Sequence, residues 1–196
     1  MSKDEIYENA TNQLVELKDT SELMIDLAYS ALLLNSNYLA QEVQQLKERV
    51  DQLDLDFEYL LLSCQMQEED VKGLIGLIRI GLTAENIADA ASEIAQVVLR
   101  GIEPHPVLRM MIDEADETVL RVTVPPDSPL VGKTLKEAQI PEETGVWVLS
   151  IKRGDKWIKP KAGTIIAPND QLIASGYADG EEDFKQLVCG CSDPQD

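Results

Sequence analysis

Residues 7–100 of this chain contain no proline, and that absence constrains the fold of the first half more than any other feature. Apolar residues recur there with helical period, which favours helices over strands. The middle part is clearest, because its apolar residues alternate at spacings of four and three, the pattern of a heptad seam. The seam consists of Leu39, Val43, Leu46, Val50, Leu53, Phe57 and Leu60.

Three helices fit this region, at about residues 12–34, 39–60 and 69–100. Asn35-Ser36-Asn37 offers side chains that cap the start of the second helix. The third helix carries Ala84, Ala88, Ala91 and Ala95 along neighbouring rows, where another backbone can approach closely. Gly101 and the segment Pro104-His105-Pro106 then end the helix, so His105 is interpreted as a linker residue. We therefore expect a helical domain at 8–104 and a second domain at 105–190.

The second domain contains short β-type runs at 121–124, 146–151 and 171–175, bounded by Pro, Gly and Asp. Arg153-Gly154-Asp155-Lys156 predicts a hairpin turn in which Gly154 takes positive φ. Thr134 and Glu137 have the spacing of a capping box, so a short helix should begin there. With a further helix at about 179–188, the chain is predicted to be α+β: a three-helix bundle followed by a small α+β domain.

Gly132-Lys133-Thr134 resembles the end of a phosphate-binding loop, but such a loop needs a glycine five residues before Gly132. Asp127 stands there instead, so we interpret the segment as a turn and a helix cap. One histidine and scattered serines do not assemble a nucleophile, a base and an orienting group, so the chain is not expected to be an enzyme.

Composition excludes several classes of function. No run approaches the ~20 apolar residues that span a bilayer, and no secretory signal is present, so a cytoplasmic location at the inner face of the membrane is expected. The formal charge of -19 excludes nucleic acid and anionic lipid as main partners. Either function or a salt-rich cytoplasm accounts for that acidity. The cysteines at 64, 189 and 191 lack the spacing of a zinc site and are interpreted as incidental reduced thiols.

The C-terminal segments resemble one known regulatory module. They are Asp127-Ser128-Pro129-Leu130-Val131-Gly132-Lys133-Thr134-Leu135, then Val148-Leu149-Ser150-Ile151-Lys152-Arg153-Gly154, then Pro160, Asn169-Asp170-Gln171-Leu172-Ile173 and Gly176. Together they resemble the C-terminal domain of the RCK/TrkA family. The resemblance implies ligand sensing in a regulator of potassium channels or transporters, and a two-fold pairing of the domain.

Two carboxylate pairs stand one helical turn apart in the helical half: Glu22 with Asp26, and Glu85 with Asp89. A three-helix unit with such pairs on two helices resembles the PhoU family, whose motifs of this form bind iron or zinc clusters. The resemblance implies metal ligation by these four residues, and hard oxygen ligands would suit Mg²⁺, Mn²⁺ or iron. PhoU proteins contain two three-helix repeats and this chain contains one. Either a second copy supplies the other half, or the metal site is vestigial.

A homodimer would supply that half, since heptad seams leave apolar faces that a second copy can cover. The segment 152–161 adds a basic island, with five of the chain's 17 basic residues and one acid. It is either a solvated hairpin that protects a sheet edge or an anion site, in which Lys152, Arg153 and Lys159 contact phosphate and Trp157 stacks on a base. The resembling family includes members that bind cyclic dinucleotides, so a cyclic dinucleotide or another nucleotide is the expected ligand.

Two functions follow from these observations. The first is a non-catalytic cytosolic regulator of cation transport, of potassium in particular, that senses a small anionic ligand and acts on a membrane channel or transporter. The second is a PhoU-like metal-binding regulator of phosphate uptake, with a phosphate permease as its partner.

Overall fold

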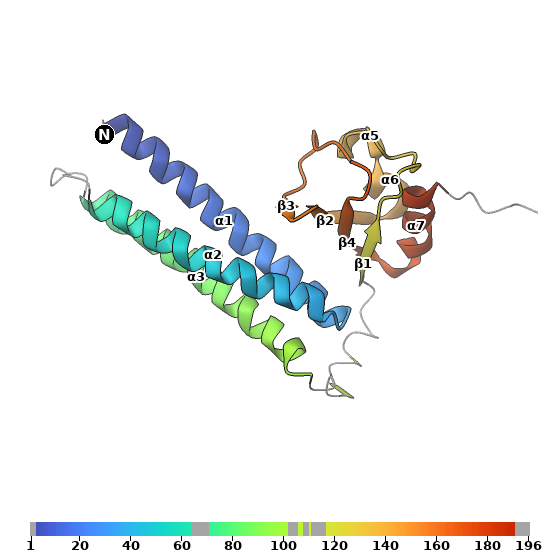
Figure 1. Ribbon diagram of the computed structural model, residues 1–196, viewed down its shortest axis with the longest axis horizontal. Helices are drawn as coiled ribbons and strands as arrows, with labels where there is room; N and C mark the ends of the chain where they lie inside the picture. Colours follow the sequence, from blue (N-terminus) through green and yellow to red (C-terminus); the bar gives the residue numbers. More distant parts are fainter. Residues whose placement is uncertain (1–2, 64–70, 102–105, 108–109, 111–116, 191–196) are drawn as a thin grey trace, which may run out of the picture. The chain divides into compact units, whose positions relative to one another are not determined.

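The computed structural model describes residues 3–63, 71–101, 106–107, 110 and 117–190. The chain divides into two compact units, at 1–102 and 103–196, and each is treated on its own (Figure 1). The first unit consists of helices and the second combines a sheet with short helices, which confirms the predicted α+β class. His105, Cys64, Cys191 and the predicted helix start at Glu69 lie outside the described residues.

The helical unit contains α1 (Lys3–Leu33), α2 (Asn37–Leu62) and α3 (Val71–Leu99). All three predicted helices are present, although α1 begins well before residue 12. Ser36 caps α2 as predicted, since its side chain accepts a hydrogen bond from the backbone N–H of Leu39. Asn35 adopts a left-handed conformation, with φ of 47°, and so turns the chain between α1 and α2.

The heptad seam of α2 packs inside the unit. Leu39, Val43, Val50 and Phe57 are fully buried, and the other seam residues are half-buried. The expectation that this seam offers a second copy an open face is therefore wrong, because α1 and α3 already cover it. If a dimer forms through the helical unit, it must use another face.

Small residues on α3 allow the three helices to approach closely. Ala84, Ala88, Ala91 and Ala95 are buried, as the sequence predicted for a row approached by another backbone. Gly81 extends this row, and a Cβ atom there would come within 3.1 Å of the Phe57 ring on α2. A side chain at Gly81 would therefore push α2 and α3 apart.

The second unit is built on a four-stranded antiparallel sheet with the order β1-β4-β2-β3. The strands are β1 (Glu117–Thr123), β2 (Val146–Arg153), β3 (Lys156–Ile158) and β4 (Gln171–Tyr177). The three predicted strands are confirmed, and β3 is the return strand of the predicted hairpin. Gly154 has φ of 59°, as its turn requires. Gly176 lies where β4 meets β2, and a Cβ atom there would come within 2.3 Å of the carbonyl oxygen of Gly145.

Three short helices complete the unit, α5 (Leu135–Ala138), α6 (Ile140–Thr144) and α7 (Glu181–Cys189), the last preceded by the 3₁₀ turn η1 (Ala178–Gly180). Thr134 and Glu137 form the predicted capping box, so Gly132-Lys133-Thr134 is a turn and a cap. Hydrogen bonds from Thr134 to the Glu137 carboxylate lower the pKa of that carboxyl. Helix α6 was not predicted; Pro141 in its first turn was the available signal.

A buried carboxylate organises the loop before β4. Asp170 is fully buried and accepts hydrogen bonds from the Arg153 guanidinium, Nε to Oδ1 at 2.8 Å and a terminal nitrogen to Oδ2 at 2.7 Å. Its Oδ2 also accepts from the backbone N–H of Ala167 at 2.8 Å. Arg153 donates as well to the carbonyl of Ile165 at 2.7 Å. This network joins the end of β2 to the segment that leads into β4.

Replacement of Asp170 by Asn should destabilise the second unit by about 2 to 3 kcal/mol, because one partner of a buried ion pair is removed and a backbone donor loses its acceptor. Urea unfolding followed by tryptophan fluorescence measures this unit alone, since both tryptophans, Trp147 and Trp157, lie in it. Asp155→Asn, in the exposed hairpin turn, is the matched control and should change stability by less than about 0.5 kcal/mol. Equal effects of the two variants would contradict the structural role of Asp170.

Candidate functional site

The four carboxylates predicted to bind metal lie on α1 and α3. On α1, Glu22 is exposed and forms an ion pair with Lys18 one turn earlier, Nζ to Oε1 at 2.8 Å, while Asp26 is half-buried. On α3, Glu85 is half-buried and Asp89 is exposed. The contacts of Glu85 and Asp89 with α2 were not predicted.

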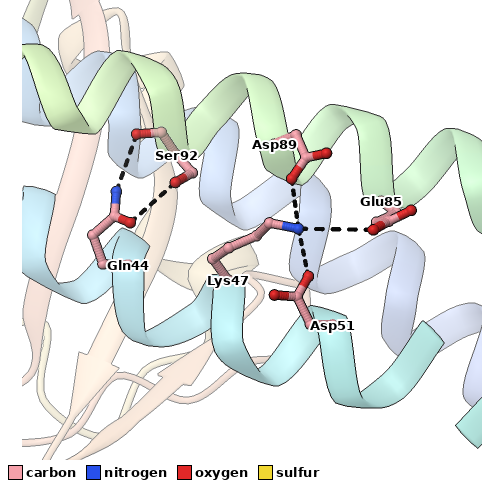
Figure 2. Close-up of polar contacts among 6 residues, drawn as sticks. All are labelled: Gln44, Lys47, Asp51, Glu85, Asp89 and Ser92. Carbon is pink, nitrogen blue, oxygen red and sulfur yellow. Dashed lines mark hydrogen bonds and ion pairs between the residues drawn. The ribbon is translucent and has the colours of Figure 1, made fainter. Parts of the chain in front are cut away.

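Lys47 of α2 projects between the acidic side chains of α3 (Figure 2). Its Nζ lies 2.6 Å from Asp89 Oδ1 and 4.0 Å from Glu85 Oε1, and it also pairs with Asp51 one turn further along α2. One turn before Lys47, Gln44 and Ser92 exchange two hydrogen bonds of 3.0 Å between α2 and α3. A polar layer therefore joins these two helices.

The ammonium of Lys47 supplies the positive charge that the sequence assigned to a metal ion. Burial alone would lower its pKa, but hydrogen bonds to Asp51 and Asp89 outweigh burial and raise the pKa above its ordinary value. Lys47 therefore stays charged at neutral pH. Across the described part of the chain, no three acidic, histidine or cysteine side chains gather in a way that could hold a metal ion. Metal binding at Glu22, Asp26, Glu85 and Asp89 stays a prediction.

Asp54 is an acidic residue that the sequence analysis missed. It is 8% exposed on α2 and lies opposite Gly81, and within the described residues its Oδ1 is buried without a hydrogen-bond partner. Burial raises the pKa of this carboxyl, and the nearby charges of Glu58 and Glu85 raise it further against the opposing effect of Lys47. Its i+7 relation to Lys47, at the border of the apolar seam, was the available signal.

A Lys47→Met variant tests whether the carboxylates around Lys47, those of Asp51, Glu85 and Asp89, can bind metal. Without the ammonium, Asp51, Glu85 and Asp89 repel one another, so a divalent cation should bind on the order of tenfold more tightly than in the parent. We would titrate Mn²⁺ and measure bound metal after purification without chelator. The control, Lys47→Met with Glu85→Gln and Asp89→Asn, should lose the gain. Equal metal content in all three proteins would show that these side chains form only an ion-pair network.

Two of the three candidate ligand residues in the basic segment 152–161 already form contacts within the domain that the sequence did not predict. Arg153 is held by Asp170 and the carbonyl of Ile165, so its guanidinium serves the fold. Lys152 is 8% exposed, and its ammonium lies 5.4 Å from the centroid of the Trp157 ring, a cation–π contact. Lys159 and Arg153 are exposed, whereas Lys152 is buried.

The segment after β3 also borders a cleft of about 290 Å³. Lys161 from this segment and Lys136 from α5 line it, together with the half-exposed ring of Trp147. Trp147 is held edge-on by Tyr177, with ring centroids 6.3 Å apart. Glu142 is the acidic residue of the lining; its other members are Leu135, Ile140, Pro141, Val148, Pro160 and Ala162. Two cations and an indole face suit an anion that carries an aromatic ring.

A larger depression of about 600 Å³ lies between α6 and α7. Glu143 and Asp183 line it, and no lysine or arginine is among its lining residues within the described part of the unit. Because carboxylates repel anions, the cleft with Lys136 and Lys161 is the better anion site.

Comparison with known domain families identifies both units. Residues 14–98 match the PhoU domain family and residues 119–188 match the TrkA-C domain family. The chain therefore consists of a PhoU domain followed by a TrkA-C domain, as the sequence predicted. Among curated proteins, none matches the chain.

Several solved structures are similar. The RCK_C domain dimer of S. agalactiae BusR in complex with c-di-AMP is 24% identical, with a TM-score of 0.34, over 36% of this chain and 93% of that one. The GsuK RCK domain is 20% identical, with a TM-score of 0.35, over 67% of this chain and 30% of that one. BusR in complex with its busA-promotor DNA is 18% identical, with a TM-score of 0.35, over 63% and 67%.

Proposed function

We propose that this chain is a non-catalytic regulator of cation transport, of potassium in particular, that senses a small anionic ligand through its TrkA-C domain. The observation that carries the proposal is the cleft beside β2, in which Lys136, Lys161 and Trp147 lie together within the TrkA-C domain. In a chain of formal charge -19, two ammonium groups beside an indole are a local exception that suits a phosphate-bearing ligand with an aromatic base.

The ligand site differs from the one proposed on the hairpin. Lys159 remains a contributor, because it is exposed and lies next to Pro160 and Lys161 of the cleft. Arg153 and Lys152 are assigned structural roles, since Arg153 binds Asp170 in the loop before β4 and Lys152 packs on Trp157. The volume of about 290 Å³ is at the lower end of ordinary ligand sites, so it holds one nucleobase or phosphate group of a nucleotide, while the rest of the ligand lies outside the cleft.

The regulator is proposed to act as a cytoplasmic homodimer on a membrane-embedded channel or transporter. No helix in the described part of the chain is long and apolar enough to cross a membrane. We propose that the transport step itself belongs to that partner. The second candidate function, regulation of phosphate uptake with a phosphate permease as partner, is favoured by the PhoU match at 14–98.

Ligand binding is tested by thermal unfolding with c-di-AMP, NAD, ATP and ADP. A ligand at a hundredfold excess over its Kd should stabilise the parent by about 2.7 kcal/mol, because it binds only the folded state. Lys136→Ala with Lys161→Ala should remove most of that stabilisation, and Lys159→Ala should reduce it. Lys133→Ala with Lys156→Ala is the matched control, since it removes the same charge from exposed positions outside the cleft. No shift in the parent, or equal shifts in both double variants, would contradict a site in this cleft.

The transport partner is tested by co-purification of the tagged chain from native membranes. We expect a potassium channel or transporter subunit to be retained, and the retention to change when the ligand found above is added. Retention of a phosphate permease would instead support the second candidate function. A preparation in which neither is enriched over an unrelated acidic protein of the same size would contradict both.

A further inference from the structure

Helix α3 carries a second heptad seam on its outer side. From Gly73 to Val97, residues alternate at spacings of three and four, and none is charged. The large members of this outer seam are Ile80, Ile87, Ile94 and Val97; the small members are Gly73, Gly76, Thr83 and Ala90. All are exposed except Ile94, which is half-buried, and Ile80 remains 52% exposed. The buried alanine row occupies a different side of the helix, so α3 has one seam inside the unit and one outside.

Within the described residues, no neighbouring atom requires glycine at two positions of the outer seam. A Cβ atom at Gly73 or Gly76 would meet nothing within 4 Å, whereas one at Gly81 would meet Phe57. Glycine inside a helix costs about 1 kcal/mol relative to alanine. Close approach of another helix would explain glycine at both positions.

We propose that the outer seam of α3 is the homodimer interface of the helical unit, formed by antiparallel two-fold pairing of α3 with α3 of a second copy. In this pairing each layer consists of one residue from each copy, and the two residue numbers add up to 170. Each layer sets a small residue against a large one. The layers are Gly73 with Val97, Gly76 with Ile94, Ile80 with Ala90, and Thr83 with Ile87, each occurring twice. Alternation of small and large residues across an interface is what allows two helices to interdigitate without voids.

Other arrangements of the same seam fit less well. Parallel pairing would set Gly73 against Gly73 and Gly76 against Gly76, which leaves gaps at one end of the seam. Moving the antiparallel register by one heptad leaves residues at one end of the seam without a partner. The two-fold antiparallel arrangement is the one that uses all eight residues in complementary layers.

Charges beside the outer seam agree with this register. Arg79 and Glu93 flank it on the same side, and the pairing brings Arg79 of each copy beside Glu93 of the other. Within the described residues neither side chain forms an ion pair in its own chain, so both are available. Asn86 then faces Asn86 at the two-fold axis. Lys72 and Arg100 come together only at the ends, where both are exposed to water that screens their repulsion.

This interface rests on the proposed homodimer and specifies which surface forms it. Cross-linking tests the register in the full chain with Cys64, Cys189 and Cys191 replaced by Ser. One tagged copy carries Ile80→Cys and an untagged copy carries Ala90→Cys. Mild oxidation of the mixture should give the mixed disulfide. Ile80→Cys alone should not link to itself, because in this register the two positions lie roughly 15 Å apart along the helix. Leu55→Cys, also exposed but on α2, is the control and should give no specific product.

A charge exchange tests the orientation independently. Arg79→Glu alone and Glu93→Arg alone each create two like-charge contacts, so each should weaken self-association roughly 4- to 30-fold. A mixture of the two variants restores both ion pairs and should form heterodimers in preference to either homodimer. Association is measured by light scattering and by native mass spectrometry.

The outcomes separate the interface from the proposed dimer. A dimeric parent with no disulfide between positions 80 and 90, or with no preference for the charge-exchanged heterodimer, would overturn the outer seam while leaving a dimer through the TrkA-C domain. A monomeric parent, near 22 kDa at micromolar concentration, would overturn both. Neither result affects the ligand titration of the cleft, which is read from a single chain.

Discussion

Close packing of α3 against α1 and α2 determines where the acidic side chains and the apolar seams of α3 lie in the helical unit. The buried row of Gly81, Ala84, Ala88, Ala91 and Ala95 lets the helix backbones approach, and small side chains at these positions are a condition for that approach. The same approach brings Lys47 to Glu85 and Asp89 and places Asp54 against Gly81. Because one side of α3 is used inward, its second apolar seam faces outward. The cluster of Asp54, Glu85 and Asp89 around Lys47 and the exposure of the outer seam thus both follow from the side of α3 that packs inward.

A single buried carboxylate has a comparable role in the TrkA-C domain. Asp170 satisfies a backbone donor and two guanidinium donors, so Arg153 is tied to the loop before β4. The charge proposed to bind a ligand comes from lysines on the neighbouring segments, Lys136 and Lys161, which line the same cleft as Trp147. A basic sequence run therefore separates into residues that hold the domain together and residues that line its cleft.

The sequence predicted most of the fold because its signals were local. Heptad spacing, the Ser36 cap, the Thr134 and Glu137 capping box and the Gly154 turn each depend on neighbours within a few residues, and all are confirmed. The partners of the candidate site residues were not predictable in that way. Lys47 meets Glu85 and Asp89 from another helix, and Arg153 meets Asp170 seventeen positions later, so both contacts arise from tertiary packing. The spacing of the outer seam is visible in the sequence. Its exposure depends on tertiary packing, because the alanine row determines which side of α3 faces the other helices.

Regulation requires more than a ligand that binds. A ligand with equal affinity for two states of the protein does not change their relative populations. The cleft can therefore control a partner only if its affinity for the ligand differs between those states. In the proposed homodimer, association and dissociation of two copies would supply such states without a change of fold, and a ligand that prefers one of them would change the dimer population by the same factor as its preference. A ligand that binds one state roughly a hundredfold more tightly than the other favours that state by about 2.7 kcal/mol. This free energy exceeds what one surface ion pair contributes. The outer seam, uncharged and complementary to itself, therefore matters to the proposed function as the interface whose population the TrkA-C ligand would have to control.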